Sequence, residues 1–108
     1  MINVAINGFG RIGRIATRVL LGREDLQKEL NLVAINTSGS MPAGHWAHLL
    51  KYDTAYGPLR HELKLKEVSA PQLADPADPL IGSLTLGTNE IALLAQPDPG
   101  KLPWEKYA

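Results

Sequence analysis

The sequence predicts an α/β fold: a partial doubly wound parallel sheet with an antiparallel hairpin excursion. Three observations support this prediction. A short apolar run at residues 2–6 precedes a glycine-rich turn, an amphipathic segment follows the turn, and residues 31–36 form a second apolar run. Parallel strands joined by a helix take a right-handed crossover, and a further strand at residues 91–95 completes a sheet of order 3-2-1.

Composition narrows the class of protein. The 108 residues suit one domain, and eleven acidic residues balance eleven basic ones. We therefore expect no bulk attraction to nucleic acid or to anionic membranes. The absence of cysteine excludes disulfides, thiolate metal sites and a cysteine nucleophile in this chain. Without a signal-peptide pattern or an apolar stretch of the roughly 20 residues that span a bilayer, a soluble, cytoplasmic protein is expected.

The glycine-rich turn is the most specific feature of the chain. Ile2 to Ile6 predict a short strand, and Gly8, Gly10 and Gly13 follow it in a Gly-x-Gly-x-x-Gly pattern. In a Rossmann-type fold the first glycine permits the tight turn, and the second lets the backbone approach a pyrophosphate. The third lets the helix pack close to the strand. The pattern therefore predicts a dinucleotide site.

A helix is predicted from Gly10 to Leu21. Its first N–H groups, those of Gly10, Arg11 and Ile12, lack partners inside the helix, and together with the helix dipole they favour an anion. An apolar stripe is expected to face the sheet, and Gly22 is expected to form a left-handed cap at the C-terminal end. The stripe consists of Ile12, Ile15, Ala16, Val19 and Leu20.

Three arginines share one side of this predicted helix. Arg11, Arg14 and Arg18 follow the i, i+3, i+7 spacing. They can meet phosphates or a neighbouring subunit, or they can form a solvated face with mild mutual repulsion. The solvated face is favoured for Arg18, and both alternatives stay open for Arg14. A nucleic-acid-binding role for this side is disfavoured because the net charge is zero.

The second strand ends where a dinucleotide fold offers a carboxylate to the adenine ribose, about 20 residues after the glycines. Asn36, Thr37 and Ser38 stand there, with no acid among them. A carboxylate would bind a free 2′-hydroxyl and repel a 2′-phosphate, whereas Thr37 and Ser38 can donate hydrogen bonds to a phosphate. The hypothesis is a site that tolerates NADP or prefers it to NAD. The alternative is that Thr37 is only a turn residue.

The remaining elements are predicted from periodicity and turn residues. We expect a helix at 42–50, a turn at 52–58, a half-exposed strand at 59–66 and a proline-rich surface segment at 68–79. Residues 81–86 and 90–95 bracket a three-residue loop and predict a hairpin whose second arm is the third parallel strand. Asp75 and Asp78 are interpreted as solvated loop charges, and the chain shows no metal-ligand spacing.

Three strings of residues point to one family. They are Ile6-Asn7-Gly8-Phe9-Gly10-Arg11-Ile12-Gly13-Arg14, Val33-Ala34-Ile35-Asn36, and Leu50-Lys51-Tyr52-Asp53-Thr54 with Gly57. These strings resemble phosphorylating glyceraldehyde-3-phosphate dehydrogenase. The hairpin and the Lys101-x-x-Trp104 segment are similar too, so the resemblance covers nearly the whole chain. The run from His48 to Thr54 also resembles the sister erythrose-4-phosphate dehydrogenases, which keep the same cofactor domain.

The resemblance implies that residues 1–108 are the N-terminal portion of an NAD(P)-binding domain, from a glycolytic oxidoreductase acting on a sugar-phosphate aldehyde. The backbone of Arg11 and Ile12 is implied to meet the pyrophosphate. Thr37 stands where the family usually carries aspartate on the ribose, which questions a strict NAD preference. Pro97 stands where the family commonly places arginine beside the adenine, leaving that contact to backbone or to Gln96. The implied cofactor-binding residues are Asn7, Gly8, Phe9, Gly10, Arg11, Ile12, Gly13, Asn36, Thr37, Ser38, Gln96 and Pro97.

The resemblance assigns no catalytic residue to this chain. The family's catalytic cysteine, histidine base and phosphate-binding residues lie beyond the position of Ala108, in the catalytic domain. His45, His48 and His61 lie where the resemblance gives no catalytic role, and surface or packing roles are expected for His48 and Trp46. Covalent aldehyde chemistry needs an activated nucleophile, so the isolated chain is expected to bind nucleotide without catalysis. The alternative is a stand-alone nucleotide-binding or interaction module.

A sheet of order 3-2-1 leaves the first strand at an edge. The family that the chain resembles continues the sheet with a fourth strand beside the first, and without that strand Ile2 to Ile6 form an unpaired apolar edge. Unpaired edges of this kind invite pairing with another copy. The sequence therefore predicts a homo-oligomer, self-associating through the first strand, or a poorly stable chain.

Overall fold

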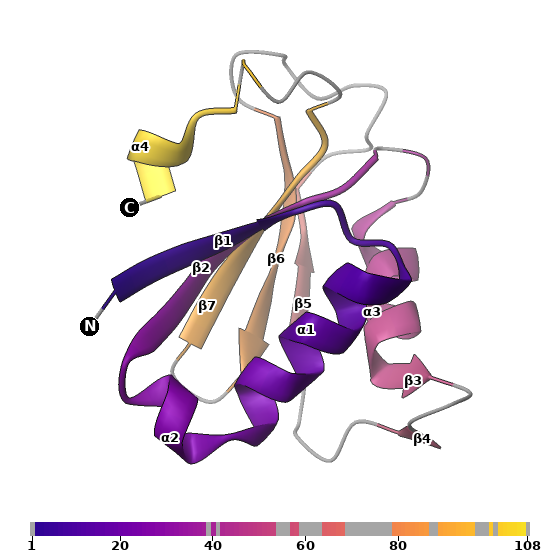
Figure 1. Cartoon of the computed structure of the whole chain (residues 1–108). Helices are drawn as coiled ribbons and strands as arrows, with labels where there is room; N and C mark the ends of the chain where they lie inside the picture. The colour runs from indigo at the N-terminus through magenta and orange to yellow at the C-terminus, as the bar shows by residue number, and fades with distance from the viewer. Residues whose placement is uncertain are drawn as a thin grey trace.

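A five-stranded sheet organises the computed structural model of the chain (Figure 1). The structure describes residues 2–38, 40, 42–53, 57–58, 64–68, 79–86, 89–96, 100 and 102–107. The strands lie in the order β1-β2-β7-β6-β5. Their bounds are β1 (Ile2–Asn7), β2 (Leu30–Asn36), β7 (Asn89–Leu94), β6 (Leu80–Leu86) and β5 (Lys64–Glu67).

The parallel half of the sheet agrees with the predicted order. β1 pairs with β2 and β2 pairs with β7, both in parallel, so the three strands lie as 3-2-1. The sheet is larger than predicted because β6 and β5 continue it antiparallel beyond β7. The hairpin of β6 and β7 is confirmed, but Asn89 already pairs with Leu86, so its loop is shorter than the predicted three residues.

The described residues cover part of the excursion between β2 and β6. β5 is the described part of the strand predicted at 59–66, and it ends at Glu67. Residues 59–63 lie outside the described residues, as do 69–78 with Asp75 and Asp78. Where a turn was predicted at 52–58, β3 (Tyr52–Asp53) pairs antiparallel with β4 (Gly57–Pro58).

A bulge in β2 sets which side chains face the core. Leu32 lies opposite Val4, but Ala34 lies opposite the next residue of β1, so Val33 is an extra residue in β2. Side chains alternate between the faces of a regular strand, which would separate Leu32 from Ile35. The bulge instead lets both side chains join the same buried cluster.

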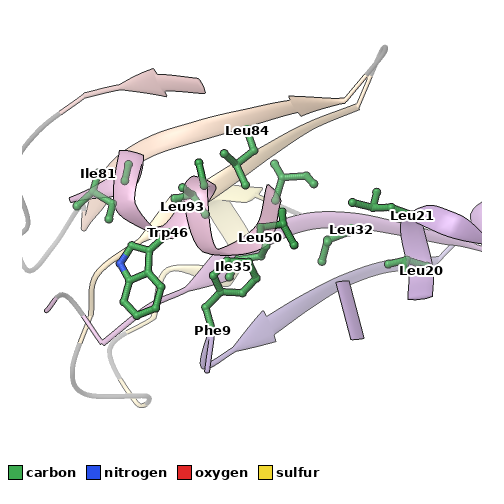
Figure 2. Packing of buried hydrophobic residues seen from close by; sticks show 13 residues of the cluster. Phe9, Leu20, Leu21, Leu32, Ile35, Trp46, Leu50, Ile81, Leu84 and Leu93 are labelled. Atoms are coloured by element: carbon green, nitrogen blue, oxygen red, sulfur yellow. The ribbon is translucent and has the colours of Figure 1, made fainter. Parts of the chain in front are cut away.

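The sheet has a main core on one face and a smaller one on the other. Figure 1 shows α1 (Arg11–Gly22) and α3 (Ala43–Lys51) on one side of the sheet and α4 (Trp104–Tyr107) on the other. Along β7, Ile91 and Leu93 join the main cluster, whereas Ala92 and Leu94 join the smaller one, against which Leu102 packs. The main cluster also contains Phe9, Leu20, Leu21, Leu32, Ile35, Ala43, Trp46, Ala47, Leu50, Ile81 and Leu84 (Figure 2).

The apolar stripe predicted for the first helix faces the core only in part, because Leu20 is its one buried member. Ile12 is 84% exposed and Val19 is 47% exposed, whereas α1 buries Thr17 with Leu20 and Leu21. The reason is the contact between the helix and the preceding turn. A Cβ built on Gly13 would lie 2.2 Å from the backbone O of Gly8, so the Gly13 side of the helix must face inward. Residues one and two turns further on, at i+4 and i+7, follow it into the core.

The C-terminal end of α1 also differs from the prediction. Gly22 is the last helical residue, and Arg23 follows in an extended conformation with φ −120°. Among the described residues, only Gly8 has a positive φ, so the left-handed cap predicted at Gly22 is wrong. The chain turns directly into the short helix α2 (Glu24–Gln27), and the side-chain amide of Gln27 donates to the Leu21 carbonyl. A side chain therefore satisfies a carbonyl that a glycine cap would otherwise serve.

Arg18 connects the two helices of the main layer. Its Nε and Nη2 donate to the Leu50 carbonyl at 2.9 and 2.7 Å, and Nη2 also donates to the Lys51 carbonyl at 3.1 Å. These carbonyls end α3, where they have no partner within the helix. The solvated face favoured for Arg18 is therefore wrong: this side chain caps α3 and fixes α1 beside it.

Candidate functional site

The turn between β1 and α1 is held by hydrogen bonds and by a close backbone contact. Gly8 has φ +105°, a conformation that side chains other than glycine rarely adopt, and its N–H donates to the Asn36 carbonyl at 2.9 Å. Nη1 of Arg14 donates to the Phe9 carbonyl at 3.1 Å. Together with the contact between Gly13 and Gly8, these bonds hold the turn against the ends of β1 and β2.

The start of α1 presents donors beside open space. The first helical bond along the backbone runs from the Arg14 N–H to the Gly10 carbonyl, at 3.0 Å. The N–H groups of the three preceding residues therefore have no acceptor within the helix. No heavy atom of a described residue outside its immediate chain neighbours lies within 4 Å of a Cβ built on Gly10. Such a helix start attracts an anion through its free amides and its dipole.

Asn36 joins the ends of the three parallel strands. Its side-chain Nδ2 donates to Oδ1 of Asn7 and to the Gln96 carbonyl, both at 2.9 Å. Its Oδ1 accepts from the Gln96 N–H, also at 2.9 Å. Asn36 and Gln96 are buried. The amide of Asn36 thus has partners on β1 and after β7, and it connects the strand ends at the candidate site.

Thr37 and Ser38 differ in what their hydroxyls can reach. Thr37 is 2% exposed, and both its N–H and its Oγ1 donate to the Leu94 carbonyl, at 2.8 and 2.9 Å. Its hydroxyl hydrogen is therefore directed at Leu94. Ser38 is exposed, and its Oγ lies 2.9 Å from Oγ of Ser40. Of the two hydroxyls considered for a phosphate, the one on the surface is that of Ser38.

A cavity of about 350 Å³ lies at the carboxyl ends of β1, β2 and β7. It brings the glycine turn together with the residues that follow β2 and β7. No lysine, arginine, aspartate or glutamate is among the described residues that line it. They are Asn7, Gly8, Phe9, Gly10, Asn36, Thr37, Ser38, Trp46 and Gln96.

Eight of the twelve implied cofactor-binding residues line this cavity, and the three other described ones, Arg11, Ile12 and Gly13, do not. Arg11 and Ile12 are exposed at the start of α1, and Gly13 packs on Gly8. Pro97 lies outside the described residues. His48 is exposed, with its ring centroid 5.0 Å from that of Tyr52.

Sequence reasoning missed Trp46 as a residue of the cavity. The sequence predicts a surface or packing role for it, and its burial in the main cluster agrees with packing. Its place in the cavity lining depends on how α3 sits against the glycine turn, which no local pattern reveals. Among the described residues, no group of histidine, aspartate and glutamate could hold a metal ion, and no helix is long and apolar enough to cross a bilayer.

Comparisons with known proteins agree with this geometry. The family described as "Glyceraldehyde 3-phosphate dehydrogenase, NAD binding domain" matches residues 2–108. Glyceraldehyde-3-phosphate dehydrogenase 2 of Staphylococcus aureus is 38% identical over 104 residues, 96% of this chain and 25% of that protein. Glyceraldehyde-3-phosphate dehydrogenases 1 and 2 of Streptomyces arenae are each 38% identical over 103 residues, 95% of this chain. The chain spans about a quarter of the length of these relatives.

Proposed function

The chain belongs to the family of the glyceraldehyde 3-phosphate dehydrogenase NAD-binding domain, and on this premise we propose that it binds a nicotinamide dinucleotide at the start of α1. The observation that carries the proposal is the open space at Gly10, next to three amides without helical acceptors and on the lining of the cavity. Anions bind at such helix starts, and a pyrophosphate is the anion of a dinucleotide.

The proposed roles follow from what each group can donate. The N–H groups of Arg11 and Ile12 would bind the pyrophosphate, with Gly10 leaving room for its oxygens. Ser38 would bind the adenine ribose, because its hydroxyl is exposed beside the cavity. Asn36 would hold the strand ends in place, and Gln96 would lie near the adenine. When bound, the nicotinamide supplies the hydride acceptor of the family's reaction.

We propose that the site accepts NADP as well as NAD. No carboxylate is among the described lining residues, so nothing there repels a 2′-phosphate electrostatically. No cation lines the described cavity either, so a preference for NADP would depend on hydrogen bonds from Ser38. Binding of NAD more than about tenfold tighter than NADP would overturn this part of the proposal.

The reaction of the whole enzyme is proposed to be the oxidation of glyceraldehyde 3-phosphate, since the curated relatives carry that name. This chain has no cysteine, and aldehyde oxidation through a covalent intermediate requires a nucleophile. We expect the 108 residues alone to bind nucleotide without turning over the aldehyde. Activity assays of the purified chain with aldehyde, phosphate and NAD test this expectation.

Self-association through β1 is the second part of the proposal. β1 ends the sheet and pairs only with β2 among the described strands, and Ile2 is 65% exposed. An apolar edge without charged or proline residues can pair with a second copy. Light scattering should detect dimers or larger species, and a stable monodisperse monomer would count against this edge as an interface. A cytoplasmic location also remains a prediction.

Calorimetric titration of the folded chain with NAD, NADP and ADP-ribose tests the proposed binding. If the chain contacts only the adenosine and pyrophosphate parts, ADP-ribose and NAD should bind with equal affinity. A folded chain that binds none of the three at millimolar concentration would refute the proposal. Circular dichroism before and after titration establishes that the chain is folded.

A further inference from the structure

Trp46 is an aromatic component of the cavity rather than only of the core. It lies on α3, belongs to the main buried cluster and is 6% exposed. Trp46 lines the same cavity as Gly10 and Ser38. Figure 2 shows Trp46 and Phe9 toward one end of the cluster, with Leu20 and Leu21 at the other.

The indole of Trp46 packs against the ring of Phe9. Its ring centroid lies 6.1 Å from that of Phe9, at an interplanar angle of 59°, which is a tilted aromatic pair. Phe9 belongs to the glycine turn, and its side chain is 1% exposed. Trp46 therefore packs on the turn that presents the helix amides, and its position is linked to theirs.

The chemistry of the cavity suits an uncharged ring system. The described lining residues include the amides Asn36 and Gln96, the hydroxyl residues Thr37 and Ser38 and the aromatic Trp46, but none with a charged side chain. At about 350 Å³ it is near the lower end of ligand pockets, which span roughly 300–1,000 Å³, so it can hold part of a dinucleotide rather than the whole. The adenosine part combines an apolar base and ribose with hydrogen-bonding edges, and aromatic side chains bind such groups.

We propose that Trp46 is a binding residue for the adenosine part of the dinucleotide and that the exposed part of its indole forms one wall of the adenosine site. This inference rests on the proposed function, because it places the nucleotide in the same cavity. It follows that Trp46 should respond optically to nucleotides that contain adenosine. The chain has one other tryptophan, Trp104 in α4, which provides an internal comparison.

Two single-tryptophan variants test the proposal. Trp104→Phe leaves Trp46 as the only tryptophan, and its emission should change on titration with NAD or ADP-ribose. Trp46→Phe keeps an aromatic ring in the core but removes the indole, so its emission should not change. Its affinity for NAD and ADP-ribose, measured by calorimetry, should fall by about three- to tenfold, the size expected for one aromatic contact.

A core control separates binding from packing. Leu50 lies on the same helix, is fully buried in the same cluster and does not line the cavity. Leu50→Val should lower thermal stability without changing the NAD affinity. If Trp46→Phe lowers the NAD affinity while Leu50→Val does not, general loss of core packing is excluded as the cause. The change in the emission of Trp104→Phe then distinguishes contact with the nucleotide from a shift of the turn at Phe9.

The outcomes also separate this proposal from the proposed function. If calorimetry shows NAD binding to Trp104→Phe but its emission does not change, Trp46 is not in the adenosine site and the dinucleotide function stands. If Trp46→Phe is folded and binds NAD with the parent's affinity, the proposal is likewise overturned. If the parent chain binds no NAD by calorimetry, both proposals fall. Should Trp46→Phe not fold, the emission of Trp104→Phe alone decides.

Discussion

Gly10 and Gly13 stand three residues apart in one motif, and the structure gives them different surroundings. A Cβ on Gly13 would lie 2.2 Å from the Gly8 carbonyl oxygen, whereas a Cβ on Gly10 would meet no heavy atom within 4 Å outside its immediate chain neighbours. Gly13 is therefore required by the packing of the helix on its turn. Gly10 is not required by any contact of the described residues, and under the proposed function its lack of a side chain leaves room for the pyrophosphate.

The largest expected effect is the loss of stability when Gly13 is substituted. Gly13→Ala should destabilise the fold by about 3 kcal/mol, because a backbone carbonyl cannot move aside as a flexible side chain can. Urea denaturation followed by circular dichroism measures the loss.

Gly22→Ala provides the matched control for Gly13→Ala. Gly22 is also helical, and a Cβ there meets nothing within 4 Å, so the change should be neutral or stabilising by up to about 1 kcal/mol. Equal stability of Gly13→Ala and the parent would show that the helix does not depend on this close approach.

Thr37 and Ser38 provide a second comparison between a residue with a packing role and a residue with a proposed binding role. Thr37→Val removes the hydroxyl bond to Leu94 and should cost about 1 kcal/mol of stability while leaving the ratio of NADP to NAD affinity unchanged. Ser38→Ala should leave stability unchanged, because Ser38 is exposed, and lower the affinity for NADP relative to NAD by about threefold or more. Thermal denaturation and calorimetry measure the two quantities. The opposite assignment of effects would contradict the roles given to these hydroxyls.

The smallest expected effect lies far from the cavity, in a surface ion pair. Nη2 of Arg23 lies 2.7 Å from Oδ2 of Asp25, and this hydrogen bond lowers the pKa of the Asp25 carboxyl below its ordinary value of about 3.9. Because the folded-state pKa is lowered, the stabilisation is present above the unfolded-state pKa and is lost as the pH falls through the folded-state value. Arg23→Gln should raise the pKa of Asp25 toward the ordinary value, as measured by NMR titration. An unchanged pKa would show that the pair does not persist in solution.

Local signals in the sequence were sufficient for the strand, turn and helix that build the site. The apolar run at 2–6, the spacing of the glycines and the second run at 31–36 predicted β1, α1 and β2, and turn residues predicted the hairpin of β6 and β7. These elements depend on neighbours in the chain, which a pattern records.

The orientation of α1 could not be predicted from its own composition. The apolar stripe that includes Ile12 and Val19 suggested one inward face, but the contact of Gly13 with Gly8 rotates the helix so that these side chains are exposed. The close backbone contact between Gly13 and Gly8 therefore decided the orientation of the helix, and the apolar pattern of its side chains did not.

Contacts between distant parts of the chain were also beyond local patterns. The hydroxyl of Thr37 donates to Leu94, 57 positions away, and Asn36 bonds to the backbone of Gln96. Trp46 reaches the cavity because α3 packs against the turn at Phe9. Each of these depends on the assembled sheet, so the sequence predicted the elements around the candidate site better than the side chains that line the cavity.

The comparison of the two glycines is tested most directly by calorimetric titration of Gly10→Val with NAD. The backbone at Gly10 is extended, with φ −72° and ψ −162°, which suits a β-branched residue, so the variant should fold like the parent. We predict that its affinity for NAD falls by more than about tenfold, because the side chain occupies the space assigned to the pyrophosphate. A folded Gly10→Val that binds NAD as tightly as the parent would contradict binding at the start of α1.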